Sequence, residues 1–310
     1  MMKTSLLFPG QGSQAVGMGA GLYAAYPEAR RVFDEADSVL GFALSRLCFE
    51  GPVDELTDTA NAQPAILVTS LAFYAVVRDH LPEVDCMAGH SLGEYTALVA
   101  SNALSLTDAV RLTRQRGEWM KKAGERAPGG MLAVLNLDDN VLESLCRQAA
   151  VETGGVVQVA NYNSPGQIVI SGDMGTLERA GELAKAAGAR RVIPLKVSVA
   201  THSPLMEYAE DGLKTALASV VLAAPDVPVI ANVSARPLVT VSDVTAEMMA
   251  QLTSPVRWTA SVQEMLARGV QRFIEIGPGN VLTGLVHRTN KDVDVVNIND
   301  EGSLRAFVGS

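Results

Sequence analysis

Short apolar runs alternate with amphipathic stretches through the first 127 residues of the chain. The run Thr4–Phe8 predicts a buried strand, and the residues 84–102 predict a second strand, a tight turn and a helix. Apolar positions at helical spacing predict further helices over 27–40, 64–80, 93–103 and 107–123. Strands that alternate with helices are typical of an α/β domain built on a parallel sheet.

The pattern changes after Pro128. The elements predicted there follow the order β-α-β-β-α-β, with strands over 131–137, 156–161, 167–171 and 191–197 and helices over 140–150 and 177–187. This is the order of a ferredoxin-like unit. We therefore expect a ferredoxin-like α+β subdomain at 128–197, inserted into a large α/β domain formed by 1–127 and 198–310. A cleft is expected between the two parts.

Composition limits the class of protein. With 310 residues, 48% hydrophobic and 19% charged, the chain has the make-up of an ordinary soluble globular enzyme. A net charge of −9 argues against nucleic acid as a partner. The three cysteines, Cys48, Cys86 and Cys146, are scattered and predict reduced core residues, and no zinc-binding spacing occurs. The longest apolar run, Ala65–Val77, is too short to span a bilayer, so we expect a cytoplasmic protein without a membrane partner.

A serine flanked by glycines stands at the turn within 84–102. Gly89-His90-Ser91-Leu92-Gly93 has the form G-x-S-x-G, whose glycines permit the sharp bend that exposes a nucleophilic serine. The backbone N–H of Leu92 would point into the same space and could stabilise an oxyanion. The alternative is a serine that only caps the helix. The preceding strand and the following helix of small residues favour the nucleophile.

The glycine-rich loop after the first strand has more than one interpretation. Gly10, Gly12 and Ala15 fit a dinucleotide-binding pattern, but glycines continue to Gly21, where the helix of such a site should already have begun. We therefore set that interpretation aside. The loop could supply a backbone N–H to an anion or oxyanion site, or it could be a plain surface turn. Spacing does not choose between these two.

One arginine lies on the wrong side of its predicted helix. Arg116 falls in the middle of the apolar face of 107–123, while the neighbouring basic side chains Arg111, Arg114, Lys121 and Lys122 lie on the polar face. A buried guanidinium is costly unless it is paired. An internal salt bridge would satisfy it, and so would the carboxylate of a substrate, which a guanidinium binds with two parallel hydrogen bonds.

A serine nucleophile needs a base, and the chain has four histidines. His80 and His287 lie at predicted helix ends, where the helix dipole explains them. His90 neighbours the serine and so points elsewhere. His202 follows a predicted strand and precedes Ser203-Pro204, a helix start, and it comes after Ser91 in the order expected of a nucleophile elbow. No acidic residue stands out as its partner, so a backbone carbonyl could orient the ring.

A series of ordered blocks carries a family resemblance. FPGQGSQ at 8–14, GHSLGE at 89–94, QRG at 115–117, NSPGQ at 163–167, SVATH at 198–202 and QLTSPVRW at 251–258 resemble the malonyl-CoA:acyl carrier protein transacylases of bacterial fatty-acid synthesis. The resemblance extends over essentially the whole chain. It implies a large hydrolase-like α/β domain with a nucleophile elbow and an inserted ferredoxin-like subdomain.

The resemblance also implies roles for individual residues. Ser91 would be the nucleophile, His202 the base, and Arg116 the ligand of the malonyl carboxylate. The backbone amides of Gln11 and Leu92 would form the oxyanion hole, and the backbone carbonyl of Gln251 would orient the base. Malonyl-CoA would be a substrate, no cofactor would be needed, and a monomer would act on acyl carrier protein.

Two other activities share this set of residues. A freestanding acyltransferase that serves a polyketide synthase or a malonate decarboxylase would have the same site. A serine thioesterase or other hydrolase would use the same nucleophile and base but pass the acyl group to water. Turnover that requires a carrier protein would separate the transferases from the hydrolase.

Single residues refine the comparison with the family. Leu92 resembles the malonyl-selective members, whereas relatives that take methylmalonyl units often carry glutamine there. Lys121 departs from the family, which has glutamine at that position. The acidic carrier protein should dock on a basic patch, for which Arg190, Arg191, Lys196 and Lys121 are candidates.

Overall fold

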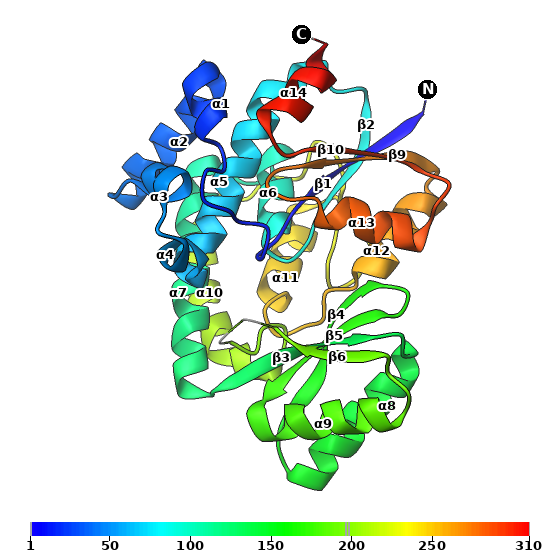
Figure 1. Ribbon diagram of the computed structural model, residues 1–310. Coiled ribbons are helices and arrows are strands. Elements are labelled where there is room, and N and C mark those ends of the chain that lie inside the picture. The colour runs from blue at the N-terminus through cyan, green and yellow to red at the C-terminus, as the bar shows by residue number, and fades with distance from the viewer. Residues whose placement is uncertain (1, 196, 198, 310) are drawn as a thin grey trace.

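The computed structural model describes residues 2–195, 197 and 199–309, which form two sheets flanked by helices (Figure 1). The strands are β1 (Lys3–Phe8), β2 (Val84–Gly89), β3 (Gly129–Leu135), β4 (Val157–Ser164), β5 (Gln167–Asp173), β6 (Arg191–Pro194), β7 (Val229–Ile230), β8 (Pro237–Leu238), β9 (Val270–Ile276) and β10 (Asp294–Ile298). The helices are α1 (Ala20–Ala25), α2 (Pro27–Leu40), α3 (Leu44–Glu50), α4 (Val53–Thr57), α5 (Thr59–Val77), α6 (Leu92–Ala100), α7 (Leu106–Arg126), α8 (Asp139–Thr153), α9 (Met174–Ala186), α10 (Glu207–Leu217), α11 (Val241–Ala250), α12 (Trp258–Ala267), α13 (Val281–Thr289) and α14 (Glu301–Val308), with 3₁₀ turns η1 (Arg78–His80) and η2 (Pro204–Met206).

The larger sheet places two loops side by side. Its order is β10-β9-β1-β2-β7-β8, and every pair is parallel except β7 with β8. Side chains alternate between its faces, so that Leu6 and Phe8 join one apolar cluster and Leu7 the other. Phe8 pairs with Gly89 at the carboxyl ends of β1 and β2. The glycine-rich loop and the Ser91 turn therefore leave the sheet at the same edge, where ligands bind in such folds.

The smaller sheet has the predicted ferredoxin-like order. Its four antiparallel strands run β4-β5-β3-β6, and α8 and α9 pack on one side of it, as Figure 1 shows below the larger sheet. The strand predicted over 191–197 ends earlier, at Pro194, although the next N–H, that of Leu195, still donates to the Met131 carbonyl of β3. Of the residues beyond it, Lys196 lies outside the part of the chain that the structure describes. The domain boundaries at 127/128 and 197/198 stay predictions.

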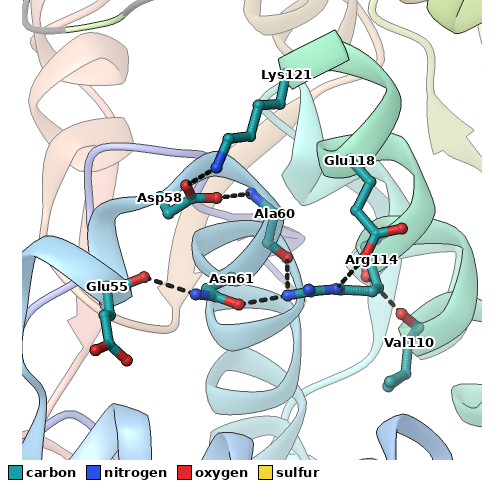
Figure 2. Close-up of polar contacts among 9 residues, drawn as sticks. Glu55, Asp58, Ala60, Asn61, Val110, Arg114, Glu118 and Lys121 are labelled. Carbon is teal, nitrogen blue, oxygen red and sulfur yellow. Dashed lines mark hydrogen bonds and ion pairs between the residues drawn. The ribbon is translucent and has the colours of Figure 1, made fainter.

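Helix α5 begins before the proline that was expected to start it. Asp58 caps the helix by accepting a hydrogen bond from the Ala60 N–H, so Pro64 lies inside the helix. Pro64 cannot donate to the carbonyl of Ala60, the residue four positions earlier. Figure 2 shows that this carbonyl instead accepts a hydrogen bond from Arg114 Nη1 of α7, at 3.2 Å. Because Arg114 satisfies the carbonyl that Pro64 cannot, the helix can include the proline.

The same helix, together with the η1 turn, is long and apolar enough to cross a membrane. However, 78% of the most apolar stretch within Thr59–His80 is buried inside the protein. It packs against α2, α6 and α7. An all-round apolar surface is equally typical of a helix enclosed by protein.

Candidate active site

The turn at Ser91 requires both of its glycines. A Cβ on Gly89 would lie 1.9 Å from the carbonyl carbon of Gly93, and a Cβ on Gly93 would lie 2.0 Å from the Phe8 oxygen. Ser91 itself has φ 51° and ψ −104°, a strained conformation that is held by a 2.7 Å hydrogen bond from its N–H to Asn232 Oδ1. Although Ser91 precedes α6, its side chain makes no capping hydrogen bond. The turn thus exposes the hydroxyl as a nucleophile elbow does.

The Ser91 hydroxyl contacts one of the four histidines. Ser91 Oγ lies 2.8 Å from His202 Nε2. On the other side of the ring, Nδ1 lies 2.9 Å from the Gln251 carbonyl and 3.1 Å from the Ser254 carbonyl. Two acceptors at Nδ1 require the proton there, which leaves the Nε2 lone pair facing the hydroxyl. Among the described residues, two backbone carbonyls therefore hold the His202 ring, and no carboxylate contacts it.

The remaining histidines have other surroundings. His90 Nε2 lies 2.8 Å from Asn163 Oδ1. His80 ends the η1 turn and His287 lies in the last turn of α13, as their sequence positions predict. Of the four histidines, His202 is the one whose ring contacts the Ser91 hydroxyl, and its role as the base stays a prediction.

Arg116 is buried without an anionic partner in hydrogen-bond contact. Its side chain is 1% exposed, and within the described residues it donates to neutral oxygens: Nη1 to Gln63 Oε1 at 2.6 Å, and Nη2 to Gln251 Oε1 at 3.0 Å. Nη2 also lies 3.2 Å from Ser91 Oγ, and the Tyr95 ring lies 5.6 Å from the guanidinium carbon. These neutral contacts take the place of the internal salt bridge that could have explained the residue. Its positive charge is directed at the serine.

A cavity of about 750 Å³ opens above the serine, between the two parts of the molecule. The larger part contributes Ser91, Arg116 and Leu282, and the smaller contributes Met131 and Val169. The predicted cleft is thus present, and its size suits an elongated organic ligand.

Two backbone amides line this cavity with no protein acceptor. Gln11 and Leu92 both border it, and among the described residues neither amide donates a hydrogen bond to the protein. The Ser91 amide, by contrast, is occupied by Asn232. The loop approaches closely because Gly10 lacks a side chain: a Cβ there would lie 2.4 Å from the His90 oxygen. Free N–H groups beside a nucleophile are what an oxyanion requires.

Comparison with known proteins shows the family of the chain. The model of the acyl transferase domain family matches residues 6–309. The malonyl CoA-acyl carrier protein transacylase of Bacillus subtilis (strain 168) is 48% identical over 308 residues, which cover 99% of this chain and 97% of that protein. The chain belongs to the family of malonyl CoA-acyl carrier protein transacylases. The transacylase of Escherichia coli (strain K12) is 43% identical over 307 residues, 99% of both chains.

Solved structures of the family have the same fold. An acyl carrier protein S-malonyltransferase from Vibrio cholerae O1 superposes with TM-score 0.95 at 44% identity, covering 98% of this chain and 99% of that one. A malonyl-transacylase in complex with its type II PKS acyl-carrier protein superposes with TM-score 0.95 at 39% identity, covering 99% of both. The α/β fold with a second, antiparallel sheet is thus the family's fold.

The structure adds residues that the sequence did not indicate. Glu94 Oε1 accepts hydrogen bonds from the Asn232 N–H at 2.8 Å and from its Nδ2 at 3.0 Å, and Glu94 Oε2 accepts from Gln251 Nε2. Burial raises the pKa of Glu94 well above its ordinary value, and the nearby Glu247 raises it further. Glu94 therefore holds both Asn232, which accepts from the Ser91 N–H, and Gln251, whose carbonyl contacts His202. An acid inside an apolar helix was a usable signal, the same one that singled out Arg116.

The basic residues predicted to form a docking patch differ in their surroundings. Arg190 and Arg191 are exposed, whereas Lys121 Nζ is paired with Asp58 at 2.7 Å, as Figure 2 shows. Lys121 is thus partly committed to a contact between α7 and the start of α5. Its role in docking stays a prediction.

Proposed function

We propose that the chain transfers a malonyl group from malonyl-CoA to the phosphopantetheine thiol of acyl carrier protein through a Ser91 acyl-enzyme. The observation that supports this substrate is the buried Arg116, which has no carboxylate in hydrogen-bond contact within the described part of the chain and whose Nη2 lies 3.2 Å from Ser91 Oγ. An acyl chain that ends in a carboxylate supplies the missing partner. The names of the relatives support the same substrate and acceptor.

In the first half-reaction, His202 Nε2 accepts the proton of Ser91 Oγ as the oxygen attacks the thioester carbon. The amides of Gln11 and Leu92 would stabilise the oxyanion, each by about 3 kcal/mol in comparable sites. The tetrahedral intermediate collapses, the C–S bond breaks, and His202 passes its proton to the departing CoA sulfur, so that CoA leaves as a thiol and the ring is neutral again. The product is malonyl-Ser91.

In the second half-reaction, the thiol of the carrier protein enters the cavity and transfers its proton to His202. The thiolate attacks the serine ester, the C–O bond breaks, and Ser91 recovers its proton from His202. The carbonyls of Gln251 and Ser254 keep the ring in the required tautomer in both directions.

Finer features of the proposal concern its setting. We propose fatty-acid synthesis as the pathway, with no cofactor, and a monomer that acts in the cytoplasm. The relatives named above support the pathway. The malonyl-transacylase solved with a type II PKS carrier supports polyketide synthesis as the second candidate.

The proposal is tested by mixing the protein with malonyl-CoA and counting CoA released. We expect a burst of about one equivalent per enzyme, followed by turnover only when carrier protein is added. Parallel assays with a fatty-acid and a polyketide carrier compare the two pathways. Continuous CoA release without any carrier would make the protein a hydrolase.

The pH dependence of acylation provides a separate prediction. Burial, and next the charge of Arg116, lower the pKa of His202 to about 3 from 6.5. The base therefore stays unprotonated as pH falls below 6.5, so the burst rate should show no loss near that pH, where an exposed histidine would lose half its activity. Rapid-quench measurements between about pH 8 and about pH 5 test this. A half-loss centred at 6.5 would contradict it.

That measurement needs a control for folding. The unfolded chain takes up a proton at the ordinary histidine pKa and the folded chain does not, so the stability contributed by His202 decreases as pH falls below 6.5. Circular dichroism at each pH separates loss of structure from loss of the base.

A further inference from the structure

A hydrogen-bonded chain joins Arg116 to the glycine-rich loop. Gln63 Oε1 accepts from Arg116 Nη1 at 2.6 Å, and Gln63 Nε2 donates to Thr59 Oγ1 at 3.1 Å. Thr59 Oγ1 in turn donates to Gln11 Oε1 at 2.9 Å. Gln63 and Thr59, in the first turns of α5, thus connect the arginine proposed to bind the substrate carboxylate with the loop of Gln11, whose amide is a proposed oxyanion donor.

The donors and acceptors in this series of hydrogen bonds are determined by the charged group at its end, the Arg116 guanidinium. A guanidinium can only donate, so the Gln63 oxygen must face Arg116 and its NH₂ group must face Thr59. The Thr59 hydroxyl accepts that hydrogen bond and has one proton left, which it donates to Gln11. A reversed Gln63 amide would bring two donors together at Arg116 in a site with no exposure to water.

The neutral amide is suited to the charge it holds. Glutamine satisfies an N–H of the buried guanidinium without placing a negative charge in contact with it. A carboxylate at this position would form a permanent ion pair and compete with a substrate carboxylate. The neutrality of Gln63 therefore keeps Arg116 available for an anionic acyl group.

Helices α5 and α7, which carry these hydrogen-bonded residues, are packed closely together. Gly117, next to Arg116 on α7, approaches α5 so closely that a Cβ would lie 2.5 Å from the Thr59 oxygen. Figure 2 shows the neighbouring contacts, in which Arg114 donates to Ala60 and Asn61 and Lys121 donates to Asp58. The first turn of α5 is thereby fixed on α7, which lets Gln63 and Thr59 act as rigid supports.

We propose that Gln63 is a positioning residue that makes the enzyme selective for carboxylate-bearing acyl groups, and that Thr59 extends its effect to the Gln11 loop. This rests on the malonyl transfer proposed above. Gln63 acts through Arg116 on selectivity, and Thr59 acts through Gln11 on the rate for every acyl group. The two roles give different kinetic signatures.

Gln63→Glu tests the first role, with kcat and KM measured for malonyl-CoA and acetyl-CoA. We expect kcat/KM for malonyl-CoA to fall about 100-fold, chiefly through KM, because the introduced carboxylate would neutralise Arg116. The value for acetyl-CoA should fall by less than about 5-fold, through the altered hydrogen bond of Thr59. Gln115→Glu is the matched control, since Gln115 is exposed beside Arg116 in the same helix and should keep the wild-type ratio.

Thr59→Val tests the second role. It removes the hydroxyl but leaves Gln63 beside Arg116, so kcat should fall about 5-fold for both substrates with their ratio unchanged. Thr59→Ser retains the hydroxyl and should restore the rate, which a purely structural role of the threonine methyl would not predict. Melting temperatures of all variants report whether each remains folded.

The outcomes separate this inference from the proposed function. If the wild type is not malonylated by malonyl-CoA, the proposed function fails and the inference fails with it. If the wild type is malonylated but folded Gln63→Glu keeps the wild-type malonyl-to-acetyl ratio, only the inference is overturned. If Gln63→Glu does not fold, a Thr59→Val rate equal to the wild type, or a Thr59→Ser rate no higher than that of Thr59→Val, overturns it.

Discussion

Ser91→Ala should leave no malonyl-enzyme and should reduce carrier-dependent transfer by a factor on the order of 10⁴ or more. The change removes the only atom that would bond to the acyl group, while His202 and the two free amides stay in place. Alanine also removes little volume, so the turn should keep its shape. Intact-mass measurement after mixing with malonyl-CoA reads the result directly, as the presence or absence of one added malonyl group.

A matched control uses a serine away from the cavity. Ser219 lies exposed after α10, where its hydroxyl bonds to the Ala216 carbonyl, so Ser219→Ala should be malonylated like the wild type. Peptide mapping of the wild type should locate the label on Ser91. Full labelling of Ser91→Ala would disprove the acyl-enzyme.

Arg116→Ala should convert a malonyl-selective enzyme into one that prefers uncharged acyl groups. Removing one partner of a buried charge pair costs about 2–5 kcal/mol, or a loss of about 30-fold to several thousand-fold in kcat/KM for malonyl-CoA. Acetyl-CoA has no carboxylate to lose this contact, so its rate should change much less. Competition between the two CoA esters, read by intact mass, measures the ratio on one sample.

Two further variants test whether the Arg116 guanidinium itself causes the malonyl preference. Arg111 lies exposed on the same helix, 3.8 Å from Asp108, so Arg111→Ala should leave the ratio unchanged. Arg116→Lys keeps a charge but loses the planar pair of donors, and we expect an intermediate preference. An unchanged malonyl preference in Arg116→Ala would remove the basis of the substrate assignment.

The part of the site within a few residues of Ser91 was predictable from the sequence. Gly89 is needed because the carbonyl carbon of Gly93 lies 1.9 Å from where its Cβ would be, and Gly93 is needed because the Phe8 oxygen at the end of β1 lies 2.0 Å from where its Cβ would be. The strand, turn and helix that bring these atoms together accompany the motif. The buried face of α7 was predictable for a similar reason, because helical periodicity alone places Arg116 among apolar residues. Both inferences depend on local backbone geometry.

The hydrogen-bond partners of these residues were harder to predict from the sequence. Periodicity showed that Arg116 is buried but left open whether a protein carboxylate pairs with it. The family resemblance supplied Gln251 through its carbonyl, while its side-chain contacts to Arg116 and Glu94 were unforeseen. The start of α5 was misplaced because the carbonyl freed by Pro64 is satisfied by Arg114, a residue on another helix.

The sequence by itself determined the elbow, the inserted β-α-β-β-α-β unit, the buried arginine and, with the family resemblance, the chemistry to expect. Only the tertiary structure decided what surrounds them. Asn232 reaches Ser91 across 141 residues, Gln251 reaches it across 160, and Gln63 reaches Arg116 across 53. Such contacts depend on how helices and loops pack around the parallel sheet, and no periodicity records them. The neutral hydrogen-bond partners of Arg116, on which the proposed substrate rests, are a property of that packing.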